Sequence, residues 1–289
     1  MNNLLTVNNL TKIYGSGRGV RNVSFELQKG RILGIVGLNG AGKTTLLSCL
    51  TGFMEWDSGD ISYNFNNNMQ DRVNGKVLED LGIVASEYGF PSNFDIKTIA
   101  HIMNSVYKNW DNKRFNTIVK TLSLDPNLKI KNYSTGMKTA MAIAIALSHD
   151  AKILILDEAT RGLDIKASAK VRDLLYDHVA DGENSIILTS HIMGEIERMS
   201  DSILLIDNGD VIFNYDKDDL LYKYRVFQMV KQHFKKIDRN DVLKMKQDDF
   251  YVRLIAVDSR KFTEKYEVES KEVPIETIIE LFLDGDDTV

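Results

Sequence analysis

The chain has only one cysteine among its 289 residues, and it has no long hydrophobic run. Because Cys49 has no partner within the chain, no internal disulfide can form, which indicates a reducing compartment. The longest apolar stretch, at 140–147, is soon interrupted by His149 and Asp150, whereas a membrane-spanning helix needs roughly 20 mostly apolar residues. If the protein serves a membrane process, another chain has to cross the bilayer.

A basic excess and a leader segment are also missing. Lysine and arginine number 36 against 41 aspartates and glutamates, a net charge of −5, which disfavours a nucleic acid as the partner. The first residues hold no basic region before an apolar core, so no signal peptide is expected. With 43% hydrophobic and 27% charged residues, the composition is that of a globular chain and excludes wholesale disorder.

The chain alternates short apolar runs with helical patterns. Continuous apolar runs predict buried strands at 32–36, 153–156, 185–189 and 203–206. Helical periods follow the first two of these runs, at 43–50 and 166–179. Continuous apolar strands separated by helices predict a parallel sheet that is covered on both faces, and hence an α/β fold.

Two regions depart from this pattern. Residues 4–7 and 20–27 alternate apolar and polar positions, which predicts an antiparallel β subdomain. The stretch 95–124 lacks strand patterns, and its apolar residues fall on one helical face after Asp95, a candidate N-cap. We therefore expect a helical subdomain at about 88–150.

The character of the sequence changes again at its C-terminal end, where charge density rises. We expect a main domain at 1–216 and a small α+β accessory domain at 217–289. Within the accessory domain, 250–257 is predicted to be a strand and 275–283 a helix. A basic, partly amphipathic pattern at 222–236 favours a surface helix that packs on the main domain, and contact with anionic lipid or a partner is the alternative.

A glycine-rich turn lies between the first predicted strand and the helix that follows it, and its spacing fits the phosphate-binding pattern at every required position. Glycines let backbone N–H groups approach phosphate oxygens closely, and the N-terminus of the helix adds positive potential. Lys43 can reach the β- and γ-phosphates, while the hydroxyl of Thr44, with Thr45 beside it, can ligate Mg²⁺. The residues predicted to bind nucleotide here are Gly37, Leu38, Asn39, Gly40, Ala41, Gly42, Lys43, Thr44 and Thr45.

Two acids follow the apolar run at 153–156. Ligands sit at the carboxyl ends of the strands in open α/β sheets. Asp157 is therefore predicted to hold Mg²⁺, and Glu158 to polarise the water that attacks the γ-phosphorus. Taken alone, the pair could also be two solvated acids, but the phosphate loop upstream favours the catalytic interpretation.

Further motifs stand in a fixed order around these two. Residues 133–137 are Tyr-Ser-Thr-Gly-Met, residues 162–164 are Gly-Leu-Asp, and His191 follows the third predicted strand. Together with Tyr14, this ordered set resembles the ATP-binding-cassette (ABC) ATPase family over roughly residues 4–215. Taken singly, Tyr14 and His191 could each be ordinary core residues, so the order of the motifs carries the resemblance.

The resemblance implies the fold, the ligands and the partners. The expected fold is a P-loop NTPase cassette with an antiparallel β subdomain and a helical subdomain. ATP and Mg²⁺ are the expected ligands, and ATP hydrolysis is the expected activity. A second ABC ATPase subunit, the same or a related chain, and transmembrane permease subunits are the expected partners. This places the protein peripherally at the cytoplasmic face of the bacterial cell membrane.

The resemblance also implies roles for single residues. Tyr14 would stack on adenine, and His191 would contact the γ-phosphate as a second catalytic residue beside Glu158. A helix capped by Ser134 would direct its N-terminus at the nucleotide of the other subunit. Further nucleotide contacts are implied for Thr135, Gly136 and Asp164, and metal contacts for Thr44, Asp157 and Ser86.

Several positions depart from the family pattern. Thr135 replaces the first glycine of the signature pair, and Met137 replaces a glutamine. Ala159 and Arg161 replace the usual proline and serine after the catalytic acid. Ser86 stands where the family has a glutamine, with Glu87 next to it, and an oxygen of either residue could face Mg²⁺ or the attacking water. These changes leave open a weakly hydrolysing regulatory subunit of a heterodimer. A soluble ABC ATPase unlinked to transport is a further alternative, although one phosphate loop and no sustained heptads argue against it.

The C-terminal end looks like that of export-type cassettes of bacteria, which handle drugs, lantibiotics and other amphipathic peptides. The asparagine- and lysine-rich composition is similar to that of such systems in low-GC bacteria, including the ATPase subunits of phenol-soluble-modulin exporters. The resemblance therefore implies that the protein powers export of amphipathic peptides, toxins or drugs through a separate permease chain.

Overall fold

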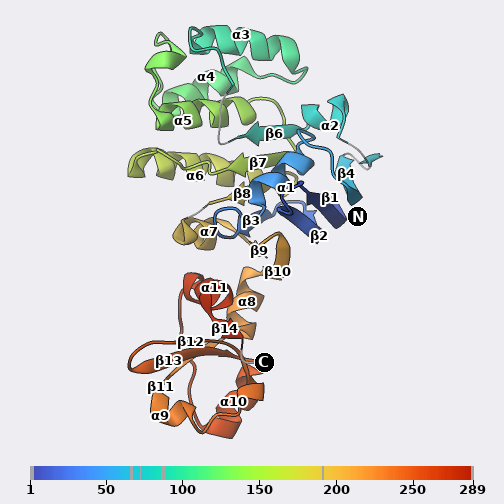
Figure 1. Ribbon diagram of the computed structural model, residues 1–289. Coiled ribbons are helices and arrows are strands. Elements are labelled where there is room, and N and C mark those ends of the chain that lie inside the picture. The colour runs from blue at the N-terminus through green and yellow to red at the C-terminus, as the bar shows by residue number, and fades with distance from the viewer. Residues whose placement is uncertain (1–2, 66–67, 72, 86–88, 191, 288–289) are drawn as a thin grey trace.

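A six-stranded sheet occupies the middle of the molecule, with the strand order β10-β9-β3-β8-β7-β6 (Figure 1). The computed structural model describes residues 3–65, 68–71, 73–85, 89–190 and 192–287. The strands of this sheet are β3 (Ile32–Val36), β6 (Leu81–Val84), β7 (Ile153–Asp157), β8 (Ser185–Thr189), β9 (Ser202–Asp207) and β10 (Asp210–Asp216). Neighbouring strands run parallel except β10, which is antiparallel to β9. The predicted α/β class is confirmed.

Both faces of this sheet are covered, which is why its inner strands are continuously apolar. All residues of β3 and β8 are buried. Ile35 and Ile155 pack on one face with α1 (Lys43–Leu50), and Val36 and Leu156 pack on the other. The helices on that other face are α5 (Thr135–Ala146), α6 (Ile165–Val179) and α7 (Met193–Met199).

A second, antiparallel sheet has the order β2-β1-β4-β5 and packs against α1. Its strands are β1 (Asn3–Ile13), β2 (Gly19–Gln28), β4 (Ser58–Phe65) and β5 (Asn68–Gln70), and a short helix, α2 (Gly75–Glu79), follows them. Buried and exposed positions alternate along the second half of β2, because one face of the sheet meets the core and the other meets solvent. The antiparallel pairing predicted for the start of the chain is confirmed.

Helices gather at one end of the molecule, at the top of Figure 1. They are α3 (Ile96–Val106), α4 (Asn112–Thr121) and α5, with a 3-10 turn at Ile130–Asn132. The side chain of Asp95 accepts a hydrogen bond from the backbone N–H of Thr98 at 2.9 Å, so the predicted N-cap is confirmed. Ile99 and Phe115 are fully buried against α5 and attach these helices to the main core.

The C-terminal region lies at the opposite end and forms a third sheet with the order β11-β13-β12-β14. Its strands are β11 (Val226–Val230), β12 (Val242–Gln247), β13 (Tyr251–Ala256) and β14 (Asp286–Asp287). Its helices are α8 (Lys217–Lys223), α9 (Lys231–Phe234), α10 (Ser259–Tyr266) and α11 (Ile275–Asp284), with a 3-10 turn at Arg239–Asp241. The strand and helix predicted within this region are confirmed as β13 and α11.

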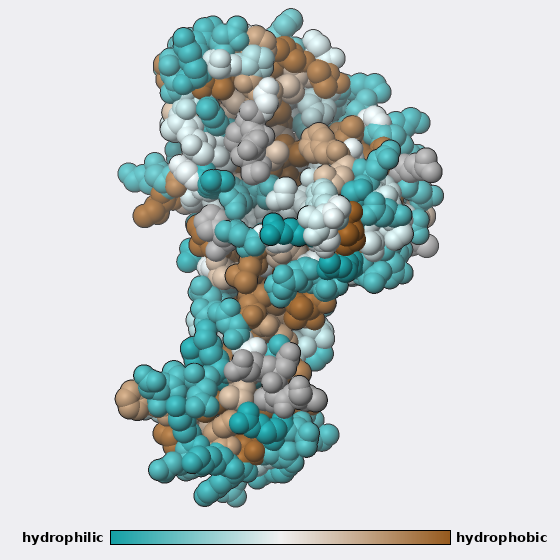
Figure 2. Space-filling view, viewed as in Figure 1, coloured by the Kyte–Doolittle hydropathy of each residue, from teal (hydrophilic) through white to brown (hydrophobic). Residues whose placement is uncertain are grey.

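Helix α11 connects this region to the central sheet. It packs on α7 as well as on β12, and Ile275, Ile278 and Leu281 are buried in the same core as Phe213 of β10. Phe227, Phe262 and their neighbours form a separate core beneath the third sheet. Figure 2 shows hydrophobic residues at the surface near the narrow waist where the two parts meet.

The helix predicted at 222–236 is wrong. Only the end of α8 and the short α9 are helical there, and 226–230 forms strand β11, paired antiparallel with β13. The apolar side chains of Phe227 and Met229 are buried by that pairing and by the core beneath it. A hydrophobic pattern over so short a stretch does not identify the partner strand, and here the pairing with a strand distant in sequence decided the conformation.

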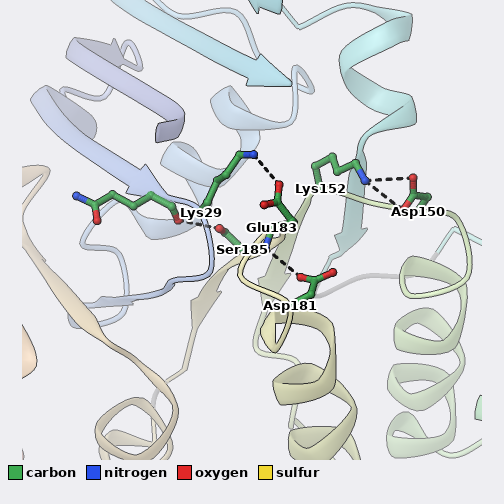
Figure 3. A network of polar contacts seen from close by, with 7 residues as sticks. Lys29, Asp150, Lys152, Asp181, Glu183 and Ser185 are labelled. Carbon is green, nitrogen blue, oxygen red and sulfur yellow. Dashed lines mark hydrogen bonds and ion pairs between the residues drawn. The ribbon is translucent and has the colours of Figure 1, made fainter. Parts of the chain in front are cut away.

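A polar network lies at the amino ends of the central strands, at the edge of the sheet away from the phosphate loop (Figure 3). Lys29 pairs with Glu183 at 2.6 Å, and Lys152 pairs with Asp150 at 3.1 Å. Asp181 accepts a hydrogen bond from the backbone N–H of Glu183 at 3.0 Å. Such partly exposed ion pairs each contribute only about 0–1 kcal/mol, so this edge is held mainly by the buried strands.

Two buried histidines make the fold sensitive to acid. Burial lowers the pKa of His149 and that of His178 from 6.5 to about 4. The unfolded chain therefore binds more protons than the folded chain between these values, and stability falls as pH decreases through this window. We expect the free energy of unfolding to fall by about 2 kcal/mol for each histidine when the pH is lowered from 7 to 5.

Urea unfolding at the two pH values measures this effect. His149 stacks on Tyr107 with a centroid distance of 3.8 Å, so His149→Phe keeps an aromatic ring and removes the proton site. The variant should lose about 2 kcal/mol less than the wild-type protein on acidification. An equal loss in both proteins would show that His149 does not carry the acid sensitivity.

Candidate nucleotide-binding site

The glycine-rich loop joins the carboxyl end of β3 to the N-terminus of α1, as the sequence predicts. Gly42 is the N-cap of α1 with a φ of 111°, and a Cβ there would lie 2.7 Å from the carbonyl oxygen of Gly19. A Cβ at Gly37 would lie 2.2 Å from the carbonyl oxygen of Ile206. The loop therefore passes so close to neighbouring backbone that these two positions admit only glycine.

Lys43 lies at the start of α1 and is half-buried. Its Nζ donates hydrogen bonds to the carbonyl oxygens of Gly37, at 2.7 Å, and Leu38, at 3.1 Å. Burial lowers the pKa of Lys43, while the charges of Glu158 and Asp157 oppose that shift. The ammonium group thus sits over the loop, facing the two acids across the site.

Asp157 and Glu158 stand at the carboxyl end of β7, where they meet the neighbouring strand β8. The hydroxyl of Thr189 donates to Oδ1 of Asp157 at 2.7 Å, and the backbone N–H of Glu158 donates to the carbonyl oxygen of Thr189 at 3.2 Å. Glu158 has a φ of 52°, in the left-handed region, which costs a residue other than glycine about 1–3 kcal/mol. Its bond to β8 holds the backbone in this conformation.

A cavity of about 410 Å³ brings the loop and the two acids together. It is lined by Tyr14, Ser16, Arg18, Gly19, Asn39, Gly40, Gly42, Lys43, Thr44, Thr45, Asp157, Glu158 and Arg161. Tyr14 is about two-fifths exposed. Its hydroxyl lies 3.3 Å from Oγ1 of Thr45 and donates a hydrogen bond to the sulfur of Met54 at 3.2 Å. The tyrosine thus stands beside the loop and lines the cavity.

Other predicted residues lie outside this cavity. Ser134 caps α5, its Oγ accepting a hydrogen bond from the N–H of Met137 at 3.2 Å, and Asp164 caps α6, its Oδ1 accepting from the N–H of Ala167 at 2.8 Å. Ser134, Thr135 and Asp164 are exposed. Gly37, Leu38, Ala41 and Gly136 also do not line the cavity. A single chain therefore does not join its capped helix to its phosphate loop.

Comparisons with known proteins agree with this geometry. The profile of the ABC transporter family matches residues 20–161. The chain is 30% identical to the lantibiotic transport ATP-binding protein SrtF of Streptococcus pyogenes over 217 residues. This alignment covers 74% of this chain and 92% of SrtF. The chain belongs to the ABC transporter family.

Two further comparisons support the assignment. The chain is 29% identical to the bacitracin transport ATP-binding protein BcrA of Bacillus licheniformis over 238 residues, 81% of this chain and 77% of that protein. A solved structure of an ATP-binding subunit of an ABC transporter aligns with a TM-score of 0.69 at 24% identity, covering 76% of this chain and 92% of that one. The predicted cassette fold is confirmed, and the protein is an ABC ATPase subunit.

Two residues predicted for this ABC ATPase, Ser86 and His191, lie outside the described residues. Their roles at the metal and at the γ-phosphate remain predictions. The strand that precedes His191 is described to Ser190, whose hydroxyl donates to Oε2 of Glu195 at 2.9 Å. Glu195 also accepts a hydrogen bond from the hydroxyl of Thr160 at 2.5 Å, so α7 ties the loop after Glu158 to the end of β8.

Sequence reasoning missed four residues of the nucleotide cavity, which are Ser16, Arg18, Gly19 and Arg161. Arg18 follows Tyr14 in a short loop with two glycines, and a cation beside the predicted aromatic residue was the available signal. Arg161 was visible only as a departure from the family pattern. Its approach to the cavity depends on how the loop after β7 folds, which no local pattern reports.

The oxygen donors of the cavity fit Mg²⁺. The Thr44 hydroxyl and the Asp157 carboxylate both line it, and Mg²⁺ beside phosphates takes one or two protein oxygens together with phosphate oxygens and waters. Across the described residues, no cluster of three or more histidine, cysteine or acidic side chains forms a metal site of its own. With protein oxygens from Thr44 and Asp157, a magnesium ion here would take its further ligands from the nucleotide and water.

Proposed function

We propose that this ABC ATPase powers the export of amphipathic peptides, toxins or drugs through a separate permease chain. The observation that carries the proposal is the joining of Lys43, Thr44, Asp157 and Glu158 around one cavity, in a chain related to bacitracin and lantibiotic transport proteins. Within the described part of the chain, no helix has both the length and the apolar character to cross a bilayer.

The residues of the cavity suit ATP hydrolysis. Backbone N–H groups of the glycine-rich loop and the ammonium of Lys43 bind the phosphates, and Tyr14 offers a face to the adenine. Thr44 and Asp157 would hold Mg²⁺, which would supply positive charge to the phosphates when bound. Glu158 orients the attacking water and accepts its proton, from a backbone position that its bond to Thr189 keeps constant.

The proposal also includes a second cassette. Ser134 and Thr135 are exposed at the N-terminus of α5, and this positive end of a helix suits the terminal phosphate bound by another ABC ATPase subunit. The partner is the same or a related chain, and Asp164 lies at the same exposed surface. Permease subunits hold the pair at the cytoplasmic face of the bacterial cell membrane.

A secretion assay tests this function. The gene is deleted in the bacterium that encodes it, and released amphipathic peptides, with phenol-soluble modulins measured first, are quantified by mass spectrometry. We expect secretion and tolerance of added peptide to fall, and to return with the wild-type gene but not with the Glu158→Gln variant. Unchanged secretion and tolerance in the deletion strain would reject the export function.

A further inference from the structure

Arg161 places a guanidinium group beside the carboxylate of Glu158. Its Nη1 lies 3.4 Å from Oε2 of Glu158, and both side chains line the cavity that holds Lys43 and Asp157. The Arg161 side chain is 61% exposed and that of Glu158 24% exposed. The arginine therefore reaches the catalytic acid from the open side of the cavity, where its side chain has room to move.

The backbone of Arg161, in contrast, is fixed on both sides. Its N–H donates to the carbonyl oxygen of Glu158 at 3.0 Å, and its own carbonyl oxygen accepts a hydrogen bond from the hydroxyl of Thr139 at 3.1 Å. The next residue, Gly162, has a φ of 76° and packs so tightly on α5 that a Cβ at Gly136 would lie 2.2 Å from its carbonyl oxygen. The backbone of Arg161 is therefore held in place, while most of its side chain is exposed to solvent.

Electrostatics decides which partner this cation prefers. The ion pair between Arg161 and Glu158 is weak, because the Arg161 side chain is mostly exposed and water screens its charge. A triphosphate brings several negative charges into the same cavity, and guanidinium groups bind phosphate oxygens through two parallel hydrogen bonds. A terminal phosphate at this site should therefore attract Arg161 away from Glu158.

We propose that Arg161 is a phosphate-sensing positioning residue, which pairs with Glu158 when nucleotide is absent and moves to the terminal phosphate of ATP when it is bound. In the step that follows, the water oxygen bonds to the terminal phosphorus, the bond from that phosphorus to the bridging oxygen breaks, ADP leaves, and Glu158 takes the water proton. The inference rests on the proposed ATPase site and assigns it a residue that distinguishes ATP from ADP.

Binding of two nucleotides to the full-length protein tests this inference. Dissociation constants are measured for a slowly hydrolysed ATP analogue and for ADP, with turnover measured in parallel. Arg161→Gln should weaken binding of the ATP analogue by about tenfold but that of ADP by less than about twofold, because ADP lacks the terminal phosphate. Turnover should fall by about tenfold, and Arg161→Lys, which keeps the charge, should recover part of both losses.

Arg260→Gln is the matched control, because Arg260 and Glu264 form another local arginine–glutamate pair, 3.1 Å apart, on α10. It should leave both dissociation constants unchanged. Parallel weakening of ATP-analogue and ADP binding by Arg161→Gln, or no change in either, would overturn the inference. If Arg161→Gln does not fold, the same comparison is made with Arg161→Lys. Failure of the wild-type protein to bind or hydrolyse ATP would instead reject the proposed function.

Discussion

Replacing Lys43 with alanine is expected to weaken ATP binding by about 100-fold or more, because the phosphates lose the main cation of the loop. Lys43 is half-buried and already held over the loop by the carbonyl oxygens of Gly37 and Leu38. Its ammonium needs only to turn from these carbonyls to the phosphate oxygens. Among the described residues that line the cavity, Lys43 is the one lysine, and Arg18 and Arg161 are the other cationic side chains.

Equilibrium binding of a fluorescent ATP analogue measures the loss. Lys29→Ala is the control, because Lys29 also pairs with an acid but lies in the polar network at the opposite edge of the sheet (Figure 3). That variant should bind as the wild-type protein does. If the Lys43→Ala variant still bound the ATP analogue with micromolar affinity, the assignment of the glycine-rich loop to nucleotide binding would be refuted.

Replacing Glu158 with glutamine is expected to lower ATP turnover by about 100-fold or more while leaving ATP bound. The amide has nearly the shape of the carboxylate, and the backbone that aims it is held by Thr189 of β8. The change therefore removes the proton acceptor, together with the negative charge that pairs with Arg161. Because hydrolysis then no longer releases the subunits, an ATP-bound dimer should accumulate. Phosphate release and light scattering in Mg-ATP measure the two effects.

Glu183→Gln is the matched control, since Glu183 pairs with Lys29 far from the cavity and should leave turnover unchanged. Near-zero turnover in both the wild-type protein and Glu158→Gln would favour the alternative function, a weakly hydrolysing regulatory subunit of a heterodimer, which the departure at Thr135 suggests. A Glu158→Gln protein that stays monomeric in excess Mg-ATP would argue against sites shared between two cassettes.

Local patterns predicted much of the central sheet. The runs at 32–36 and 185–189 became β3 and β8 because continuous apolar residues fit only strands buried on both faces. The cap at Asp95 was equally local, since it depends on a hydrogen bond to Thr98 three residues away. Strand β11 was missed because its partner, β13, lies far along the chain, and periodicity does not report pairing.

The sequence by itself determined the chemistry of the phosphate loop and the position of the acids, because both depend on residue types at short spacings beside a strand. Only the tertiary structure decided that Thr189 bonds to Asp157 and to the backbone of Glu158, and that Thr139 bonds to the backbone of Arg161. Those contacts arise where separate strands, loops and helices meet at one edge of the sheet. Their geometry depends on how the whole sheet packs, which no local spacing encodes.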